Sequence, residues 1–246
     1  MSAKINHKYY SVFAGEWGSR EALRVRRKIF HQLSAVVEFA ELQKVLDVGI
    51  TADKSRRENN FFENWFPCKR IITALSDQDG AWMEQDYPGL HFVQGDGRAM
   101  PFADKSFDLV FSSATLEHVG SYDNQLIFIK ECCRVSRRHV FITTPNRWHP
   151  IELHTCLPML HWLPVPIHRE ILKMLGLHLF AKEENLNLLD QDALKKIART
   201  LELKKYTIFT VTFLKFTSNL LLYADVTTDT AISHIGGRKK RLSSYE

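Results

Sequence analysis

Five short apolar runs alternate with segments of helical length between residues 44 and 143, and this alternation limits the chain to few folds. The runs are rich in Val, Ile and Phe, as buried strands are, and cover residues 44–48, 70–75, 91–94, 107–112 and 139–143. Segments of helical length lie between them at 58–66, 80–86 and 124–135. Parallel strands need crossovers of this length. We therefore expect a Rossmann-like, doubly wound α/β fold with helices on both faces of a mostly parallel sheet.

The alternation ends in the last part of the chain. Two further strand candidates, residues 206–216 and 219–226, are separated by only two residues, which is too short for a crossover. They are expected to form an antiparallel C-terminal hairpin and to bring the sheet to seven strands. A helix is predicted before them at 190–201, with Asp190 as its N-cap and apolar residues along one face.

Composition fits one globular domain rather than two. The chain has 246 residues, 45% of them hydrophobic and 25% charged. We expect a single domain over residues 1–235, with an N-terminal helical cap at 1–40 and an apolar helical insertion after strand five at 147–187. Residues 236–246 are expected to form a basic disordered tail, with four basic residues against one acid. The net charge of +5 therefore sits largely in this tail, which disfavours a nucleic-acid partner.

Cysteine usage and the two ends of the chain bear on location. The four cysteines form no CxxC pair, and the N-terminus lacks the apolar stretch of a secretory signal. No uninterrupted apolar stretch reaches the length of about 18 residues that a membrane span requires. We expect a cytoplasmic protein without a transmembrane segment. Peripheral contact with a membrane stays open, because the basic run at 238–241 can either meet anionic headgroups or remain solvated.

Ligands of open α/β sheets bind beyond the carboxyl ends of the strands, so the residues that follow each strand matter most. The first strand is followed by Gly49 alone, next to Asp47, where a pyrophosphate site would have three glycines. This disfavours an NAD-dependent oxidoreductase and favours a positively charged ligand. Residues 95–97 (GDG) offer a carboxylate and a backbone N–H that suit adenine, although such a turn is common. Glu117 and His118 follow the fourth strand.

Three motifs occur in a fixed order: VLDVG at 45–49, GDGRAMPFADKSFDLV at 95–110 and LEH at 116–118. Together they resemble class I S-adenosylmethionine-dependent methyltransferases of the small-molecule group, over about residues 44–146. The resemblance implies that the first loop lies along the methionine portion of the cofactor, that the GDG turn holds adenine, and that the end of strand four lies near the sulfonium. The residues it assigns to cofactor binding are Asp47, Val48, Gly49, Ile50, Ser76, Asp77, Asp96, Gly97, Arg98, Ser112 and Ser113.

The sequence departs from that family at the ribose site. Where the family has an acid that binds both ribose hydroxyls, this chain has Ser76, and Asp77 is the nearest substitute. Asp79 is better suited to capping the following helix. This chain also lacks two further features of the family, the GxG at the end of the first loop and the PGG before the fifth strand. A non-catalytic S-adenosylmethionine-binding module with a degenerate ribose site is therefore the alternative to an enzyme.

Methyl transfer from a sulfonium is an in-line displacement that depends mainly on positioning of the acceptor and exclusion of water. An acceptor hydroxyl would also gain from a general base, for which His118 is the first candidate and Glu117 the second. His118 can alternatively shape the pocket without moving a proton. No metal is required. The predicted activity is methylation of a small or lipid- or glycan-linked acceptor, at oxygen rather than carbon or nitrogen.

The insertion is the most individual part of the chain. After Pro166, apolar residues recur at helical spacing at Ile167, Ile171, Met174 or Leu175, and Leu179, which predicts an amphipathic helix. The helix can cover a hydrophobic or lipid-linked acceptor, or form a helical subdomain packed against the sheet, and the second interpretation is favoured. The aromatic segment 7–17 offers the same choice between a lid and a leading helix.

Three histidines in the insertion recur every seven residues, at His154, His161 and His168. Prolines interrupt any continuous helix through them, and only Glu152 and Cys156 lie nearby as further ligands. We therefore predict no metal site from this repeat.

Overall fold

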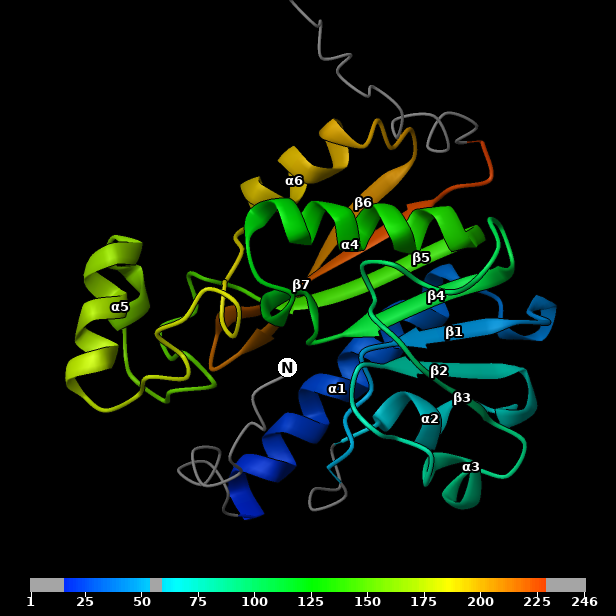
Figure 1. The fold of residues 1–246 in the computed structure, drawn as a ribbon, viewed down its shortest axis with the longest axis horizontal. Helices are drawn as coiled ribbons and strands as arrows, with labels where there is room; N and C mark the ends of the chain where they lie inside the picture. Colours follow the sequence, from blue (N-terminus) through cyan, green and yellow to red (C-terminus); the bar gives the residue numbers. More distant parts are fainter. Residues whose placement is uncertain (1–15, 54–58, 229–246) are drawn as a thin grey trace, which may run out of the picture.

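The computed structural model describes residues 16–53 and 59–228, and its centre is a single seven-stranded sheet (Figure 1). The strands are β1 (Val45–Val48), β2 (Ile72–Ser76), β3 (His91–Gln94), β4 (Phe107–Ser113), β5 (Ser136–Pro145), β6 (Tyr206–Phe213) and β7 (Phe216–Asp225). Their order is β3-β2-β1-β4-β5-β7-β6. The first five strands pair in parallel, and β7 is antiparallel to both β5 and β6. The predicted doubly wound, mostly parallel sheet with an antiparallel C-terminal hairpin is confirmed.

Helices cover both faces of the sheet (Figure 1). One face carries α1 (Glu16–Val36), α2 (Phe61–Trp65) and α3 (Met83–Asp86), and the other carries α4 (Tyr122–Val135) and α6 (Gln191–Thr200). A further helix, α5 (Val165–Met174), stands apart from the sheet in the insertion. Short 3-10 turns occur at Phe39–Glu41, Lys69–Ile71, Leu116–His118 and Leu160–Trp162. Among the described helices, none combines the length and the apolar character needed to cross a bilayer.

A separate hydrophobic core lies on each face of the sheet. On the first face, α1 contributes Ile29 and Leu33, and the ring of Phe62 in α2 stacks on Phe111 of β4 at a centroid distance of 4.4 Å. On the second face, α4 and α6 bury residues such as Phe128. Because both faces are covered, the parallel strands are apolar throughout rather than alternating. The N-terminal cap predicted at 1–40 thus includes a leading helix packed on the sheet, while the aromatic residues before residue 16 lie outside the described residues.

The turn of the C-terminal hairpin differs from the prediction. It lies at Leu214 and Lys215, which have φ values of 50° and 68°, and not at residues 217–218. Two left-handed residues in succession are what a type I′ hairpin turn requires. Ser218 is instead a buried residue of β7, whose hydroxyl donates to the Val211 carbonyl at 3.1 Å. Polar residues suggested the turn, whereas backbone geometry set it where the sequence has no Gly or Asn.

Two helices start later in the structure than the sequence predicts. The helices expected at 58–66 and 80–86 begin later, at Phe61 and Met83, while residue 58 lies outside the described residues. The carboxylate of Asp79 accepts a hydrogen bond from Ala81 N at 3.1 Å in the turn before α3, but the N-cap of α3 is Trp82, so the capping role predicted for Asp79 is wrong. Asp190 caps α6 by accepting from Ala193 N at 2.9 Å, as predicted.

The insertion leaves the sheet after β5 and returns before α6. Its two ends are close together, since Asn146 and Leu189 form an isolated parallel bridge and Arg147 N donates to Leu189 O at 2.9 Å. It has a small core of its own, built from Leu172, Phe180, Ala181 and Leu186. The segment therefore forms a small substructure of its own beyond the carboxyl end of β5.

Most of the apolar stripe predicted in the insertion is exposed. Ile167 is 51% exposed, Met174 85% and Leu175 56%, because α5 turns only Leu172 into the small core. The helix also ends at Met174, so Leu179 does not belong to it. The prediction that this stripe packs against the sheet is therefore wrong, and the stripe forms an open apolar surface.

At the amino edge of the sheet, the carboxylate of Asp108 joins three elements. Its Oδ2 accepts from Gln43 N at 2.8 Å and Lys44 N at 2.9 Å, and its Oδ1 accepts from Arg137 Nε at 2.5 Å. Burial alone would raise the pKa of this carboxyl, but the hydrogen bonds and the guanidinium charge lower it to about 2. Asp108 therefore ties the starts of β1, β4 and β5 as an ionised group.

We expect Asp108→Asn to lower the free energy of unfolding by roughly 2 kcal/mol at pH 7, because a carboxyl with a depressed folded pKa stabilises the protein above its unfolded pKa. This contribution is lost as the pH falls from about 4 toward 2. Urea unfolding of the two proteins at pH 7 and pH 3 measures the difference, which should shrink at the lower pH. The control is Asp104→Asn, whose carboxylate pairs with Arg134 but is 57% exposed. Equal losses in both variants would contradict the assignment.

Candidate active site

The loops after β1, β2 and β4 meet at the carboxyl edge of the sheet. Gly49 has a φ of +89°, and a Cβ there would come within 2.1 Å of the Thr115 hydroxyl. Its N–H donates to the Leu75 carbonyl at 2.7 Å, and the Ser76 hydroxyl donates to the Ile50 carbonyl at 2.9 Å. The close approach and the positive φ explain why this first loop requires glycine at position 49.

The two serines predicted at the end of β4 have different surroundings. Ser112 is fully buried, and its hydroxyl donates to the Val48 carbonyl at 2.8 Å. Ser113 is half-buried and its hydroxyl lies 3.0 Å from that of Thr143 in β5. Ser112 therefore joins β4 to β1, whereas Ser113 is the more accessible of the two.

The GDG turn after β3 carries a partly exposed ion pair. Arg98 binds the carboxylate of Asp96 through Nη2 at 2.7 Å and through Nε at 3.0 Å, and these hydrogen bonds lower the pKa of Asp96. A Cβ on Gly97 would lie 2.6 Å from the ring of Phe128, so this residue also has no room for a side chain. Asp77 is exposed beside the turn, and its carbonyl accepts from Gln94 Nε2 at 3.2 Å. The turn thus presents an ionised carboxylate at the protein surface.

The carboxyl of Asp47 is directed into the interior. It is 5% exposed and lies beside the fully buried Glu63 of α2. Burial and the nearby Glu63 carboxyl raise the pKa of Asp47 well above its usual value, and burial also raises that of Glu63. Two buried carboxyls this close do not both ionise, so the pair holds a proton. The charge of Asp47 is therefore not presented to a ligand, in contrast to the sequence expectation.

Glu117 and His118 lie beyond the end of β4, against the insertion. Glu117 is fully buried; its Oε2 accepts from the Thr144 hydroxyl at 3.0 Å, while its Oε1 has no hydrogen-bond partner among the described residues. Nδ1 of His118 lies 2.6 Å from the carbonyl of Asn185. A carbonyl only accepts, so Nδ1 carries the proton and the lone pair is on Nε2. Burial lowers the pKa of His118, so its imidazole is neutral at pH 7.

Sequence reasoning missed a second pair at this position, Glu152 and His154. Both are buried, and Glu152 Oε1 lies 2.6 Å from Nδ1 of His154. Burial alone would raise the pKa of Glu152, but His154 and backbone N–H groups lower it to about 2. The rings of His154 and His118 meet edge to face with centroids 4.8 Å apart. No sequence signal marks this contact, because 36 residues separate the two histidines and the insertion folds back to join them.

The other two histidines of the seven-residue repeat do not join this cluster. Nε2 of His161 lies 2.8 Å from the carbonyl of His149, and the rings of His161 and His168 meet edge to face with centroids 6.5 Å apart. The repeat itself is therefore not a ligand set.

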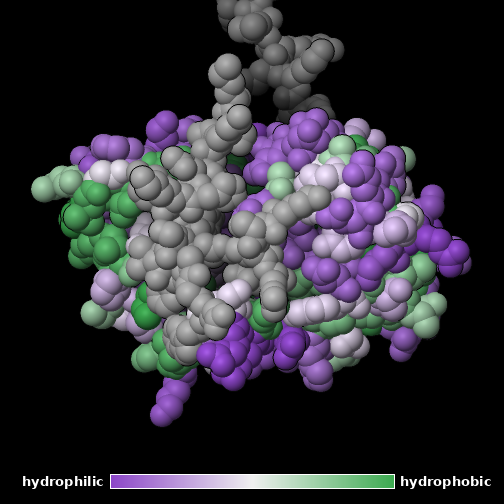
Figure 2. Space-filling view, turned by 90° about the horizontal axis from the view of Figure 1, so that it is seen from below, coloured by the Kyte–Doolittle hydropathy of each residue, from purple (hydrophilic) through white to green (hydrophobic). Residues whose placement is uncertain are grey.

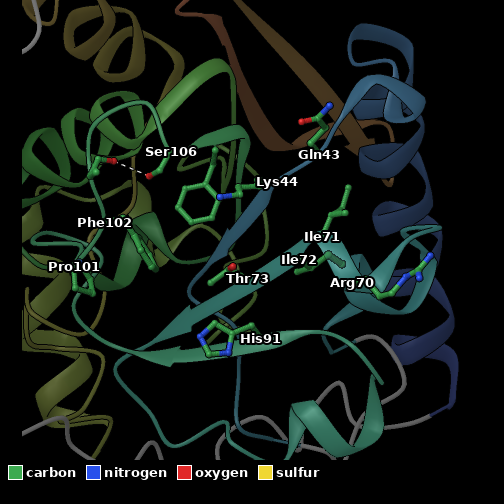
Figure 3. A pocket seen from close by; sticks show the side chains of 12 residues that line it. Gln43, Lys44, Arg70, Ile71, Ile72, Thr73, His91, Pro101, Phe102 and Ser106 are labelled. Carbon is green, nitrogen blue, oxygen red and sulfur yellow. Dashed lines mark hydrogen bonds between the residues drawn. The ribbon is translucent and has the colours of Figure 1, made fainter.

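A surface hollow of about 440 Å³ lies at the opposite, amino edge of the sheet (Figure 3). Lys44, Arg70, Thr73 and His91 are among its lining side chains, and it holds no carboxylate. None of the predicted site residues lines it. Because ligands of open α/β sheets bind at the carboxyl ends, this hollow is not the expected active site.

The strand order and the reversed last strand define the Rossmann-like fold of class I methyltransferases, and solved structures share it. The PH0226 protein from Pyrococcus horikoshii is 14% identical with a TM-score of 0.54, over 90% of this chain and 96% of that one. The 1,6-didemethyltoxoflavin-N1-methyltransferase from Burkholderia thailandensis, bound to S-adenosylhomocysteine, is 13% identical with a TM-score of 0.54, over 88% and 83% of the two chains. At this identity the similarity establishes the fold. No curated protein matches the chain.

A family comparison adds the chemistry to the fold. Residues 69–143, which run from the 3-10 turn before β2 into β5, match the family model described as a methyltransferase domain. Residues 69–143 therefore match a methyltransferase domain, and the chain as a whole has the fold of the solved structures named above.

The buried pair of Asp47 and Glu63 predicts an unusual pH dependence of stability. A carboxyl whose pKa is raised on folding stabilises the protein at low pH, and this contribution is lost as the pH rises from about 4 through the folded pKa. We expect Glu63→Gln to raise the thermal midpoint at pH 8 and to leave it nearly unchanged at pH 4. Melting curves across this range provide the measurement, with Glu170→Gln on the exposed part of α5 as control. Parallel curves for wild type and Glu63→Gln would refute the shared proton.

Proposed function

We propose that this enzyme transfers the methyl group of S-adenosylmethionine to an oxygen of an amphiphilic, lipid-linked acceptor. The observation that carries the proposal is the open apolar surface of the insertion, the segment whose His154 and Asn185 contact His118. The cofactor would occupy the loops after β1, β3 and β4. The acceptor would approach between those loops and the insertion.

On the cofactor side, the proposed contacts combine backbone and side chain. The loop at 48–50 would lie along the methionine portion, and the carboxylate of Asp96 would accept a hydrogen bond from the adenine amine. Ser76 is engaged with Ile50 O, so Asp77, whose side chain is exposed, is the better candidate for the ribose hydroxyls. Ser112 would support the floor below the sulfonium by tying β4 to β1.

On the acceptor side, activation of a hydroxyl would take place at Glu117 and His118. The neutral imidazole presents its lone pair at Nε2, which lies 3.9 Å from Oε1 of Glu117. In the displacement, the acceptor oxygen forms a bond to the methyl carbon, the carbon–sulfur bond breaks with its electron pair going to sulfur, and the hydroxyl proton passes to Nε2 of His118. Most of the rate gain would come from alignment, which is worth roughly 7 to 11 kcal/mol in well-oriented reactions.

The apolar surface is concentrated in one segment. Eight of the eleven exposed large apolar side chains of the described residues fall between 148 and 175: Trp148, Leu153, Met159, Trp162, Leu163, Ile167, Met174 and Leu175. Figure 2 shows hydrophobic surface gathered at the end of the molecule where Figure 1 places α5. Grouped apolar surface of this kind is typical of a binding or membrane-contact face. It supports an acceptor that carries a hydrocarbon part.

Two tryptophans lie on this surface. The rings of Trp148 and Trp162 are 6.4 Å apart, and the Arg147 guanidinium lies 5.6 Å from the ring of Trp148. Tryptophan with an adjacent basic group suits the boundary between lipid headgroups and hydrocarbon. This arrangement favours contact with the lipid part of the acceptor at a membrane surface.

The non-catalytic alternative rests on the altered ribose site. Incubation with methyl-labelled cofactor and a fractionated cell extract distinguishes an enzyme from a binding module, because a binding module would transfer no label. Label in the lipid fraction is expected for a lipid-linked acceptor. Label only in water-soluble or glycan fractions would overturn the acceptor class while leaving the methyltransferase intact.

For the cofactor site, we expect Asp96→Ala to weaken S-adenosylhomocysteine binding by about 10- to 100-fold, since it removes a charge-assisted hydrogen bond. His118→Ala should leave this affinity unchanged and lower turnover. Titration calorimetry measures the binding, and Asp192→Ala on the exposed face of α6 serves as control. Equal loss of binding in the Asp96 and His118 variants would contradict the division of roles.

For the apolar surface, we expect Ile167→Glu combined with Met174→Glu to abolish co-sedimentation with vesicles that contain anionic phospholipid, because charges would replace exposed apolar side chains. The matched control is Ile127→Glu on α4, where the isoleucine is 44% exposed, compared with 51% for Ile167. That control should sediment like the wild type. Failure of the wild-type protein to bind vesicles, or equal loss in the control, would refute the membrane contact.

A further inference from the structure

A cluster of three potential metal ligands lies between the end of β4 and the insertion. Glu117, His118 and His154 each offer one ligand atom, and these atoms lie within 4.8 Å of one another. Glu117 and His154 are buried and His118 is half-buried. We propose that this cluster binds a divalent transition-metal ion of the zinc type. Its use in catalysis rests on the proposed function, whereas the binding itself does not.

The donor set selects the class of ion. Two imidazoles and one carboxylate are typical ligands of catalytic zinc, which keeps a fourth position open for water or substrate. The same set also suits other borderline divalent ions such as iron(II). Magnesium and calcium prefer oxygen ligands alone and would bind poorly here.

An unsatisfied oxygen supports the site independently of the histidines. Glu117 is fully buried and its Oε2 is satisfied by Thr144, but its Oε1 has no hydrogen-bond partner within the described chain. A buried carboxylate oxygen without a partner is costly, and such groups are rare in folded proteins. A cation at this point would satisfy it.

Both imidazoles are held in the orientation that metal ligands adopt. Nδ1 of His118 donates to the Asn185 carbonyl at 2.6 Å, and Nδ1 of His154 donates to Glu152 at 2.6 Å. A carboxylate or carbonyl that holds the second nitrogen fixes the tautomer and raises the basicity of the ligating one. Each ring would therefore bind the ion through Nε2.

The distances require a small closure of the cluster. Around zinc at about 2.1 Å, neighbouring ligand atoms stand about 3.4 Å apart. Nε2 of His118 is 3.9 Å from Oε1 of Glu117, and all three ligand atoms lie within 4.8 Å of one another. Shifts of about 0.5 to 1.4 Å, which side-chain rotations can supply, would complete the coordination.

Such an ion would change how the acceptor is activated. In the open position it would attract the acceptor oxygen and lower the pKa of its hydroxyl, so that the proton passes to solvent. His118 would then serve as a ligand and not as the proton acceptor. The methyl transfer itself keeps the same bond changes.

Metal analysis of the full-length protein tests the proposal. Protein treated with a chelator and then dialysed against Zn²⁺ is expected to retain about one ion per chain, and none in the presence of Mg²⁺ alone. Glu117→Gln and His154→Gln should each weaken Zn²⁺ binding at least about tenfold, a loss typical even of altered supporting residues. His168→Gln, the same substitution in the same insertion but outside the cluster, should bind as the wild type does.

Two further measurements separate a lost ligand from a misfolded protein. Circular dichroism and melting curves establish that each variant is folded, and Co²⁺ in place of Zn²⁺ should give a ligand-field spectrum in the wild type that Glu117→Gln abolishes. Retention of no Zn²⁺ by the wild type, or Zn²⁺ binding by both cluster variants as tight as that of the wild type, would overturn the proposal. Undiminished methyl transfer by metal-free protein would overturn its catalytic use but not the proposed function. Zinc binding without lipid methylation would overturn the proposed function and leave the metal site intact.

Discussion

β1 and β4 pair in parallel at the centre of the sheet, with Val45 opposite Leu109 and Asp47 opposite Phe111. From this pair the chain winds outward in one direction through β2 and β3 and in the other through β5. The reversal leaves no crossover directly above the pair at its carboxyl end, and that is where open α/β sheets bind their ligands. The positive φ of Gly49 and the tie from Ser112 to Val48 both serve this junction. The proposed placement of cofactor and acceptor follows from it.

Buried carboxyls behave in opposite ways at different points of the fold, and the difference lies in their donors. Asp108 receives two backbone N–H groups and a guanidinium, so it remains ionised with a pKa of about 2. Glu152 reaches a similar pKa through His154 and backbone donors. Asp47 faces another carboxyl instead, and burial raises its pKa. The surroundings of a buried carboxyl group thus decide whether its ionised or its protonated form is favoured.

The sheet and the order of its elements along the chain could be predicted from the sequence, because local patterns determine them. Apolar runs and crossover lengths predicted the strands, and Asp190 was recognisable as a cap from the residues beside it. The hairpin turn at Leu214 was missed because no Gly or Asn marks its left-handed backbone. The exposed stripe of α5 was missed because helical periodicity shows that an apolar face exists but not whether anything covers it.

Within the candidate site, the sequence identified residues next to the strand ends but not their partners. The contact of His118 with His154 depends on how the insertion folds back, and the pairing of Asp47 with Glu63 depends on where α2 begins. Both are tertiary relations between residues distant in the chain. Motif position predicted that Glu117 and His118 belong to the acceptor end, while the tautomer of His118 and the neighbours of both residues required the structure.

The bridge between Asn146 and Leu189 has a consequence for how enzymes of this architecture diversify. Because the insertion departs and rejoins at adjacent points, its length and content can change without disturbing the pairing of β5 or the start of α6. If the insertion contacts the acceptor as proposed, acceptor preference can therefore change in evolution while the sheet and its loops stay the same.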